Sequence, residues 1–369
     1  MTNPLLQLEA AGQSVWLDYL NRQILEDGEL KQLIDNDGLK GLTSNPSIFK
    51  KAIVESQDYV PALKSLQASG DHSAPEIYEH LAIADIRAAT DLLRAVFDAT
   101  GGRDGYVSLE CSPYLANDTS GTIVEAKRLW AAVDRPNLMV KVPATPAGIP
   151  AIRALTGQGL NINITLLFAV SAYEKVAEAY ISGLEDLERS GGDVSKIAGV
   201  ASIFVSRIDA AVDARLDQLG DKPLFDRLRG KAAIANAKLA YAAYQTIFSG
   251  PRWRRLSASG ARTQRLLWAS TGTKSPNYRD TMYVEALVGR NTVDTIPPST
   301  MDAFRDHGRV TPDAIEEDVA GARALLAEIE ARGIGLEQIT EDLVTDGVRQ
   351  FTAAFDELFS DIARRVGRG

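Results

Sequence analysis

The sequence predicts an α/β fold, a (β/α)8 TIM barrel with extra N- and C-terminal helices, on two observations. Short apolar runs alternate with longer amphipathic runs along most of the 369 residues, a pattern typical of parallel strands joined by helices. Eight such units favour closure of the sheet into a barrel. The rival is an open, doubly wound sheet, which is disfavoured because no GxGxxG or GxxxxGK(S/T) motif follows an early strand.

The elements follow from the spacing of apolar residues. Strands are expected at 15–20, 39–44, 105–111, 138–144, 160–167, 197–205, 265–270 and 292–296. Helices, recognised by apolar residues about every 3.6 positions, are expected at 47–54, 75–99, 119–133, 147–155, 171–189, 207–219, 226–248, 283–288 and over most of 311–365. The helices before and after the barrel units are interpreted as extensions of the barrel, so we expect a single domain over residues 1–369.

Composition limits the classes of partner. The formal net charge is −9 at pH 7, which argues against nucleic acid or an anionic membrane. Cys111 is the single cysteine, so no disulfide can form within the chain, as suits a reducing compartment. No signal peptide is visible at the N-terminus, and no apolar stretch is long enough to cross a bilayer. We therefore expect a cytoplasmic protein, either a monomer or a homodimer.

Polar residues occupy one face of several expected strands. In LNINITLL at 160–167, aliphatic residues alternate with Asn161, Asn163 and Thr165, and strand side chains point alternately to opposite faces. The aliphatic face should pack on helices, so the polar face should point into the barrel, where each polar group needs a hydrogen-bond partner or a ligand. The same alternation recurs in other strands. Polar residues near the strands' C-terminal ends, where active sites of these barrels lie, are Asp18, Asn45, Glu110, Lys141, Asn163, Thr165 and Ser202.

Lys141 is the chemically informative member of this set. An apolar strand disfavours the charged ammonium, and a neutral amine attacks a carbonyl to form a Schiff base. The protonated iminium is an electron sink that stabilises the carbanion left when the neighbouring C–C bond breaks. Asp18 can take the proton from the adjacent hydroxyl, and Glu110 can move protons through a water. Asn45, Asn163 and Thr165 can hold hydroxyl groups and that water. The alternative for Lys141 is a buried ion pair with Glu110 or Asp18.

Two cations are candidates for a substrate phosphate. Arg207 follows Ser202 by five residues, where the sixth strand turns into a helix whose first N–H groups suit an anion. Lys274 lies in the turn after the seventh strand, although an ordinary solvated lysine is equally compatible with that position. The three histidines are scattered and no HExxH or Cys/His cluster exists, so we expect no metal site and no cofactor.

The same segments resemble the transaldolase family, specifically its longer bacterial type, over nearly the whole chain. The motifs that carry the resemblance are WLDYL at 16–20, GLTSNPSIF at 41–49, VSLECSPYLAND at 107–118, LMVKVPATPAG at 138–148, NINITLLF at 161–168, SIFVSRID at 202–209 and WASTGTK at 268–274. The resemblance implies a (β/α)8 barrel that transfers a dihydroxyacetone unit between sugar phosphates. Sedoheptulose 7-phosphate and glyceraldehyde 3-phosphate would give erythrose 4-phosphate and fructose 6-phosphate, in the non-oxidative pentose phosphate pathway.

The resemblance also implies roles for individual residues. Lys141 matches the Schiff-base lysine, Asp18 the strand-one aspartate and Glu110 the strand-three glutamate. The binding residues of the family match Asn45, Asn163, Thr165, Ser202 and Arg207. Fructose 6-phosphate aldolases are similar but resemble a variant with glutamine at the Glu110 position and tyrosine at the Phe204 position, so both residues favour transaldolase. A non-catalytic barrel that binds sugar phosphates is the third hypothesis. Some relatives place an arginine after the seventh strand, where this chain reads ASTGTK.

Overall fold

A computed structural model describes residues 3–70 and 72–367, in which eight parallel strands close into a barrel in chain order. The predicted (β/α)8 fold is therefore confirmed, and each strand lies within a few residues of its predicted position. The strands are β1 (Gln13–Leu17), β2 (Gly41–Thr43), β3 (Tyr106–Glu110), β4 (Leu138–Pro143), β5 (Ile162–Leu167), β6 (Gly199–Phe204), β7 (Gln264–Ala269) and β8 (Thr292–Ile296). Pairing of β1 with β8 closes the ring, with Trp16 opposite Thr295.

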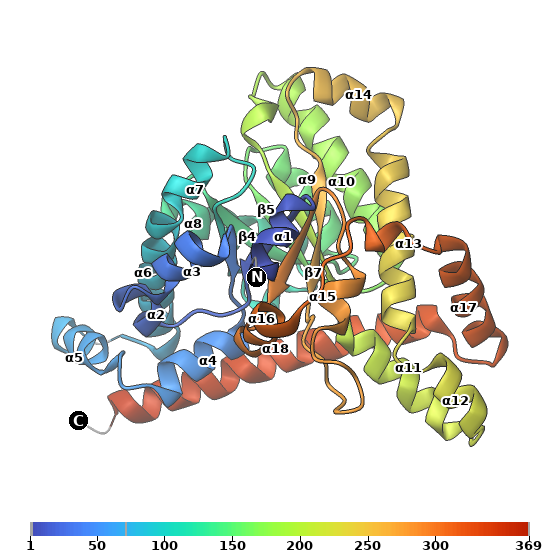
Figure 1. The fold of residues 1–369 in the computed structure, drawn as a ribbon. Helices are drawn as coiled ribbons and strands as arrows, with labels where there is room; N and C mark the ends of the chain where they lie inside the picture. Colours follow the sequence, from blue (N-terminus) through green and yellow to red (C-terminus); the bar gives the residue numbers. More distant parts are fainter. Residues whose placement is uncertain (1–2, 71, 368–369) are drawn as a thin grey trace.

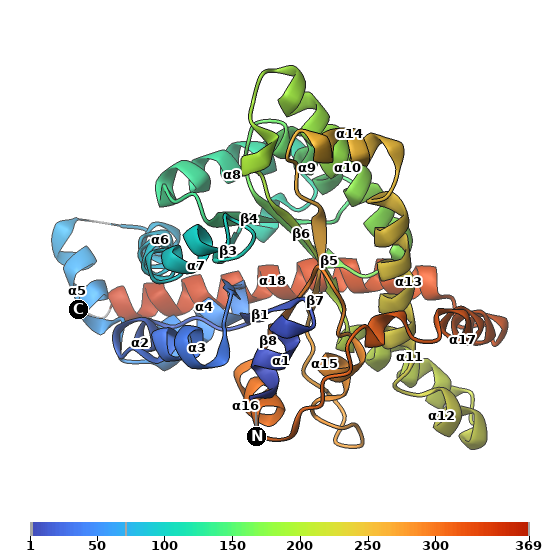
Figure 2. The ribbon, with the colours of Figure 1, turned by 45° about the horizontal axis from the view of Figure 1, so that its top comes forward.

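Helices surround the strands on the outside of the barrel (Figures 1 and 2). They are α1 (Pro4–Ala10), α2 (Arg22–Glu26), α3 (Glu29–Asp37), α4 (Pro46–Glu55), α5 (Val60–Ser69), α6 (Ala74–Leu92), α7 (Arg94–Ala99), α8 (Thr119–Val133), α9 (Gly148–Thr156), α10 (Val170–Arg189), α11 (Ser206–Gln218), α12 (Lys222–Leu228), α13 (Ala232–Ile247), α14 (Pro251–Ala258), α15 (Met282–Ala286), α16 (Pro298–His307), α17 (Val319–Ala331) and α18 (Leu336–Val366). Short 3-10 turns occur at Pro113–Leu115, Val194–Lys196 and Ala314–Glu316. Among the described residues, no helix combines the length and apolar character needed to cross a membrane.

Three predicted helical stretches are divided in the structure, and the last of them, over most of 311–365, is divided into α17 and α18 at Gly333, whose φ is 81°. The expected helix at 226–248 is split into α12 and α13 because Gly230 adopts a positive φ of 67°, a left-handed conformation that a helix cannot contain. The expected helix at 75–99 is divided at Leu93 into α6 and α7. Several helices lie outside the predicted ranges, among them α14 and α16, which both begin with a proline in the first turn, where proline is tolerated.

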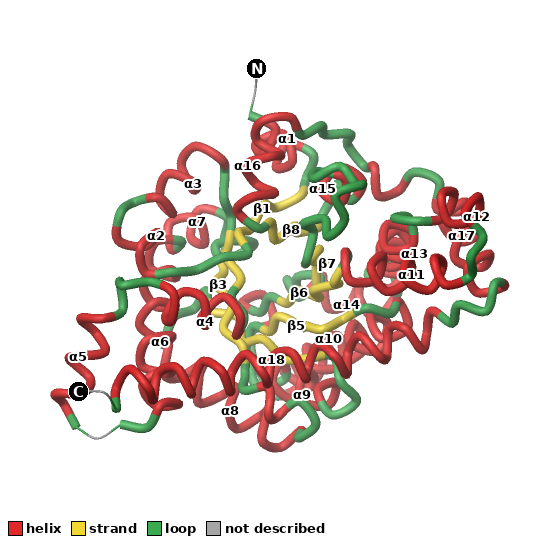
Figure 3. The backbone as a smooth tube through the Cα atoms, turned by 90° about the horizontal axis from the view of Figure 1, so that it is seen from below, coloured by secondary structure: helices red, strands yellow, loops and turns green. Residues whose placement is uncertain are grey.

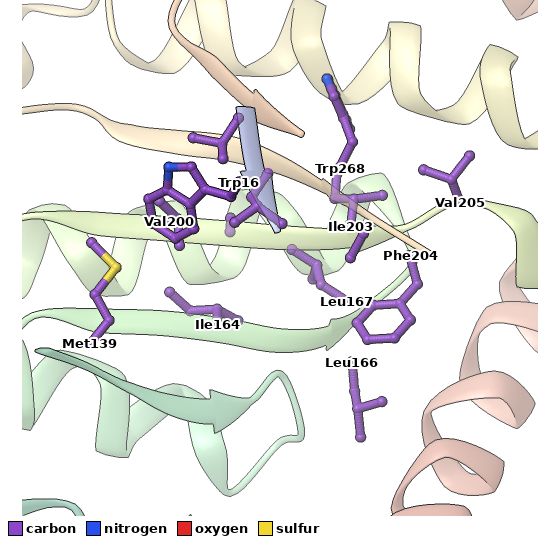
Figure 4. Packing of buried hydrophobic residues seen from close by; sticks show 14 of the residues in the cluster. Trp16, Met139, Ile164, Leu166, Leu167, Val200, Ile203, Phe204, Val205 and Trp268 are labelled. Atoms are coloured by element: carbon purple, nitrogen blue, oxygen red, sulfur yellow. The ribbon is translucent and has the colours of Figure 1, made fainter. Parts of the chain in front are cut away.

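Large side chains fill the interior of the barrel. Trp16 lies against the backbone of Gly41, where an added Cβ would stand 2.5 Å from the indole ring. Met139 and Val200 occupy the N-terminal half of the interior, and Phe204 lies at the opposite end of β6 (Figure 4). Phe204 therefore stands at the C-terminal end of the interior, which is the usual place for a ligand in this fold.

The long helix α18 passes across the C-terminal end of the barrel. Figure 1 shows it running beneath the strands beside α4 and α11, and Figure 3 views the molecule from that side. Its Gly347 packs against Leu166 of β5. Leu166 has a φ of 52° and lies in a bulge of β5, so the predicted alternation of faces holds as far as Thr165 and is broken at the next residue. The C-terminal segment therefore forms part of the mouth of the barrel.

Candidate active site

The register of the strands places three of the predicted residues at one level inside the barrel. Glu110 of β3 pairs with Lys141 of β4, and Lys141 pairs with Asn163 of β5. Paired residues of parallel strands point to the same face, so all three side chains project inward. The alternation in the sequence was sufficient to predict this arrangement.

Lys141 is almost completely buried, with 6% of its side chain exposed. Its Nζ donates a hydrogen bond to the backbone oxygen of Ser44 at 2.9 Å and lies 3.4 Å from Oε2 of Glu110. Burial raises the pKa of Glu110, and the neighbouring Lys141 opposes that rise. A carboxyl group with a raised pKa beside an amine is suited to proton exchange with groups bound to that amine.

Asp18 extends from the end of β1 toward the same space. Thr43 donates a hydrogen bond from Oγ1 to Oδ1 of Asp18 at 2.7 Å, and Thr43 is itself 2.6 Å from Oγ1 of Thr295. Burial raises the pKa of Asp18, while the Thr43 hydrogen bond and the charges of Lys141 and Lys274 lower it. The hydrogen bond leaves Oδ2 available to accept a proton from a bound molecule.

A chain of side-chain hydrogen bonds passes through Asn163, which lies at the level of Lys141. Ser202 of β6 donates from Oγ to Oδ1 of Asn163 at 2.6 Å, and Asn163 donates from Nδ2 to Oγ of Ser108 at 2.9 Å. Thr165 is buried, and among the described residues its Oγ1 has no hydrogen-bond partner. Because a buried hydroxyl without a partner costs free energy, this atom is a natural contact for a water or a ligand hydroxyl.

A cavity of about 310 Å³ lies above these residues at the mouth of the barrel. The predicted site residues that line it are Asp18, Asn45, Lys141, Thr165, Ser202, Phe204, Arg207 and Lys274. Glu110 and Asn163 do not line it, because Glu110 lies beside Lys141 and Asn163 lies behind Ser202. The structure thus brings eight predicted residues to one cavity and places the other two directly behind it.

The outer part of the cavity is cationic. Arg207 lies in the first turn of α11, half-buried, with its guanidinium 5.4 Å from the ring centre of Phe204. Among the described residues its Nη1 has no hydrogen-bond partner, and burial lowers its pKa. Lys274 and Lys51 are further cations on the lining. Backbone N–H groups at the start of α11 and these cations together suit a phosphate group.

Asn45 is held by the helix that follows it. Its Oδ1 caps α4 by accepting a hydrogen bond from the backbone N–H of Ile48 at 3.0 Å. Pro46 occupies the first turn of the same helix. The amide nitrogen of Asn45 is therefore free of the cap and lines the cavity at a fixed position.

Several lining residues were not predicted from the sequence, among them Lys51, Ser270 and Phe351. Lys51 belongs to α4, Ser270 follows β7 and Phe351 comes from α18. Ser270 has a φ of 58° and its Oγ lies 2.9 Å from Oγ of Ser206, which fixes the turn leading to Lys274. Nothing in the sequence pattern predicts the positive φ of Ser270. Across residues 3–70 and 72–367, no group of three or more His, Cys, Asp or Glu residues is placed to hold a metal ion.

Comparisons with known proteins identify the family. Residues 15–362 match the family described as Transaldolase/Fructose-6-phosphate aldolase. Relatives named Transaldolase include proteins from Parafrankia sp. (strain EAN1pec), 47% identical over 100% of this chain and 99% of the relative, and Thiobacillus denitrificans, 49% identical over 95% and 97%. Another, from Thermobifida fusca, is 46% identical over 99% of both chains.

Proposed function

We propose that this chain, which belongs to the transaldolase and fructose-6-phosphate aldolase family, transfers a dihydroxyacetone unit between sugar phosphates through a Schiff base on Lys141. It is an enzyme of the transaldolase type, since its full-length relatives carry that name. The observation that supports the Schiff base is the burial of Lys141 between Glu110 and Asp18, at the base of a cavity with a cationic outer end.

The proposed reaction begins at the amine. Neutral Lys141 adds to the ketone of a ketose phosphate, and loss of water from the carbinolamine gives an iminium. Glu110, 3.4 Å from Nζ, supplies and recovers the protons of this step. Thr165 has a buried hydroxyl without a partner in the described part of the chain, which suits it to hold the water released.

Carbon–carbon cleavage then uses Asp18. Its carboxylate takes the proton of the hydroxyl on the carbon beyond the bond that breaks, and the electron pair of that bond passes into the iminium to give an enamine. The aldose phosphate leaves, and the enamine attacks a second aldose phosphate in the reverse sequence. The Thr43 hydrogen bond holds one oxygen of Asp18, so the other is aimed at the substrate.

We propose that Arg207, with Lys274 and Lys51, holds the substrate phosphate at the outer end. Each lines the cavity, and Arg207 has donors without protein partners among the described residues. Asn45 and Ser202 contact sugar hydroxyls between the phosphate and Lys141.

The expected products fit the non-oxidative pentose phosphate pathway. We also propose a cytoplasmic location and a monomeric or homodimeric state, which size-exclusion chromatography with light scattering would determine.

Reductive trapping tests the proposal. Borohydride added with fructose 6-phosphate should fix a three-carbon adduct on Lys141, identified by mass spectrometry of the digested protein. Lys141→Arg should abolish both trapping and turnover, whereas Lys50→Arg, which changes an α4 lysine paired with Glu357, should leave both intact. An adduct on another lysine, or none, would overturn the assignment. Release of free dihydroxyacetone without an acceptor aldehyde would instead indicate aldolase activity.

A further inference from the structure

A second cavity lies at the opposite end of the barrel from Lys141. Its lining includes Arg103, which precedes β3, Arg262 and Arg265 at the start of β7, and Asn291, which precedes β8. These residues stand at the N-terminal ends of their strands, so the cavity belongs to the closed end of the barrel. Its volume, about 310 Å³, equals that of the active-site cavity.

The lining carries an excess of positive charge. Arg265 is buried and forms an ion pair with Asp104 at 2.8 Å. Among the described residues, neither Arg103 nor Arg262 has a carboxylate within ion-pair distance. Three guanidinium groups against one carboxylate leave two positive charges beside the cavity, in a chain whose formal net charge is −9.

Backbone oxygens hold the guanidinium of Arg262 without neutralising its charge. Arg262 donates from Nη1 to the backbone oxygen of Gly102 at 2.6 Å and from Nη2 to that of Gly101 at 2.7 Å. Arg103 donates from Nη2 to Oδ1 of Asn291 at 3.2 Å. A guanidinium carries five N–H donors, so both groups keep donors for a ligand. A fixed guanidinium, such as that of Arg262, loses less conformational entropy when it binds an oxyanion.

The inner wall of this cavity is apolar. Met139 and Val200 lie on the inward faces of β4 and β6, and Figure 4 shows both at the end of the interior away from Phe204. A cavity with a cationic rim and an apolar inner wall suits a small carbon skeleton that bears a phosphate. Met139 precedes Lys141 by two residues on the same face of the same strand, a rise of about 7 Å.

We propose that this cavity, here named the basal cavity and lined by Arg103, Arg262, Arg265, Asn291, Met139 and Val200, is a second binding site for a small phosphate monoester. The phosphate lies between the guanidinium groups of Arg103 and Arg262, and the carbon skeleton contacts Met139 and Val200. The site is separate from the cavity that holds Lys141, so it binds a ligand without competing with substrate.

Binding of glycerol 3-phosphate, measured by isothermal titration calorimetry, tests the proposal. Because the active-site mouth also binds phosphate in the proposed function, the experiment uses Arg207→Gln to weaken that site. Arg207→Gln protein should still bind one equivalent. Adding Arg103→Gln should weaken that binding about tenfold, because a charge-assisted hydrogen bond is lost, and adding Arg262→Gln should weaken it about tenfold again.

The control is Arg254→Gln in the same Arg207→Gln background. Arg254 is exposed and donates to the backbone oxygen of Ser249, so it matches Arg262 in contact type but lies on α14. This control protein should bind glycerol 3-phosphate with the same affinity as the Arg207→Gln protein. The Arg103 variant is the decisive one, since Arg103 is exposed and its replacement leaves the loop contacts of Arg262 in place.

Two results would overturn the basal site. Either Arg207→Gln binds no glycerol 3-phosphate, or Arg103→Gln binds it as tightly as the Arg254 control does. Failure of the proposed function has a different signature, since the absence of a borohydride adduct on Lys141 would leave the binding series unchanged.

Discussion

Asp18 and Glu110 are both buried carboxyl groups, and their different contacts support the different roles proposed for them. Glu110 faces the lysine nitrogen, whereas Asp18 is oriented by Thr43 toward the cavity. Groups whose environments differ in this way can act at different steps of one reaction. In the proposed reaction the Schiff base forms before the C–C bond breaks, so the two steps can be separated experimentally.

We predict that Asp18→Asn blocks bond cleavage while sparing Schiff-base formation. Turnover should fall about 10²- to 10⁴-fold, the usual contribution of a general base, while borohydride still traps substrate on Lys141. Glu110→Gln should instead slow the trapping itself. Stopped-flow trapping with mass spectrometry distinguishes these outcomes. If Asp18→Asn lost trapping as completely as turnover, the assignment of separate steps would be wrong.

The pH dependence of turnover should report the environment of Asp18. Burial raises its pKa above 3.8, so the carboxylate base is lost as the pH falls through that raised value. We therefore expect the acidic limb of kcat/KM to lie above pH 3.8. The measurement is kcat/KM from pH 4 to pH 8, with stability checked at each pH. A profile flat down to pH 4 would contradict a buried base.

Asp294 is a buried carboxyl group that the reaction does not use. Thr271 donates from Oγ1 to its Oδ1 at 2.9 Å, and among the described residues its Oδ2 has no partner. Burial raises the pKa of Asp294 to about 8. Between pH 3.8 and 8 the unfolded chain ionises this group while the folded chain keeps the proton, so rising pH favours unfolding.

We predict that Asp294→Asn removes this dependence. The free energy of unfolding of the wild type should fall relative to the variant by about 1.4 kcal/mol per pH unit, because one proton is taken up on folding. Urea unfolding at pH 5, 6, 7 and 8 measures the difference. A difference that stays constant across this range would show that Asp294 is ionised in the folded protein.

Strand periodicity predicted the inward residues well because it depends on local chemistry alone. Glu110, Lys141 and Thr165 each stand out as polar residues among aliphatic neighbours. Lys51 offers no such signal, since it follows Lys50 in an ordinary amphipathic helix, and only the fold shows that one faces the cavity while the other pairs with Glu357. Phe351 is likewise a typical buried position of a long helix.

The course of α18 could not be predicted because amphipathic patterning gives a helix its buried face but not its partner. An apolar stripe fits the outside of a barrel and its mouth equally well. One small contact places α18 at the mouth of the barrel and not on its outside. Gly347 allows the helix to approach Leu166 in the bulge of β5, and this approach places Phe351 at the cavity.

We predict that Gly347→Val displaces α18 and weakens the site. An added Cβ would lie 2.6 Å from Cδ2 of Leu166, and overpacking of this kind costs about 1–3 kcal/mol. The free energy of unfolding should fall, and KM should rise because the displaced helix carries Phe351, which lines the cavity. Ala353→Val on an exposed position of the same helix controls for the β-branched side chain. Adding Leu166→Ala should partly restore the stability of the Gly347→Val variant. A lack of coupling between the two substitutions in this double-mutant cycle would contradict the packing argument.

The molecule as a whole carries a buried hydrogen-bond network at one end of the barrel and the proposed active site at the other. At the N-terminal end, Asp104 accepts hydrogen bonds from Ser14, Trp16 and Arg265, which joins β1, β7 and the segment before β3 across the interior. At the C-terminal end, Thr165 and Arg207 keep atoms without partners in the described chain. The Asp104 network stabilises the barrel from inside, whereas the unpaired atoms of Thr165 and Arg207 are available to a ligand.

We predict that Asp104→Ala destabilises the protein by about 3–5 kcal/mol, because it leaves the buried guanidinium of Arg265 without its carboxylate. The control is Asp91→Ala, which breaks an exposed pair with Arg135 and should cost at most about 1 kcal/mol. Urea unfolding measures both. Because Asp104 lies at the end of the barrel away from Lys141, kcat of the folded Asp104→Ala protein should stay near the wild-type value. A variant as stable as the control would show that the Asp104 network does not stabilise the barrel, and a stable variant with reduced kcat would show that this network acts on the active site.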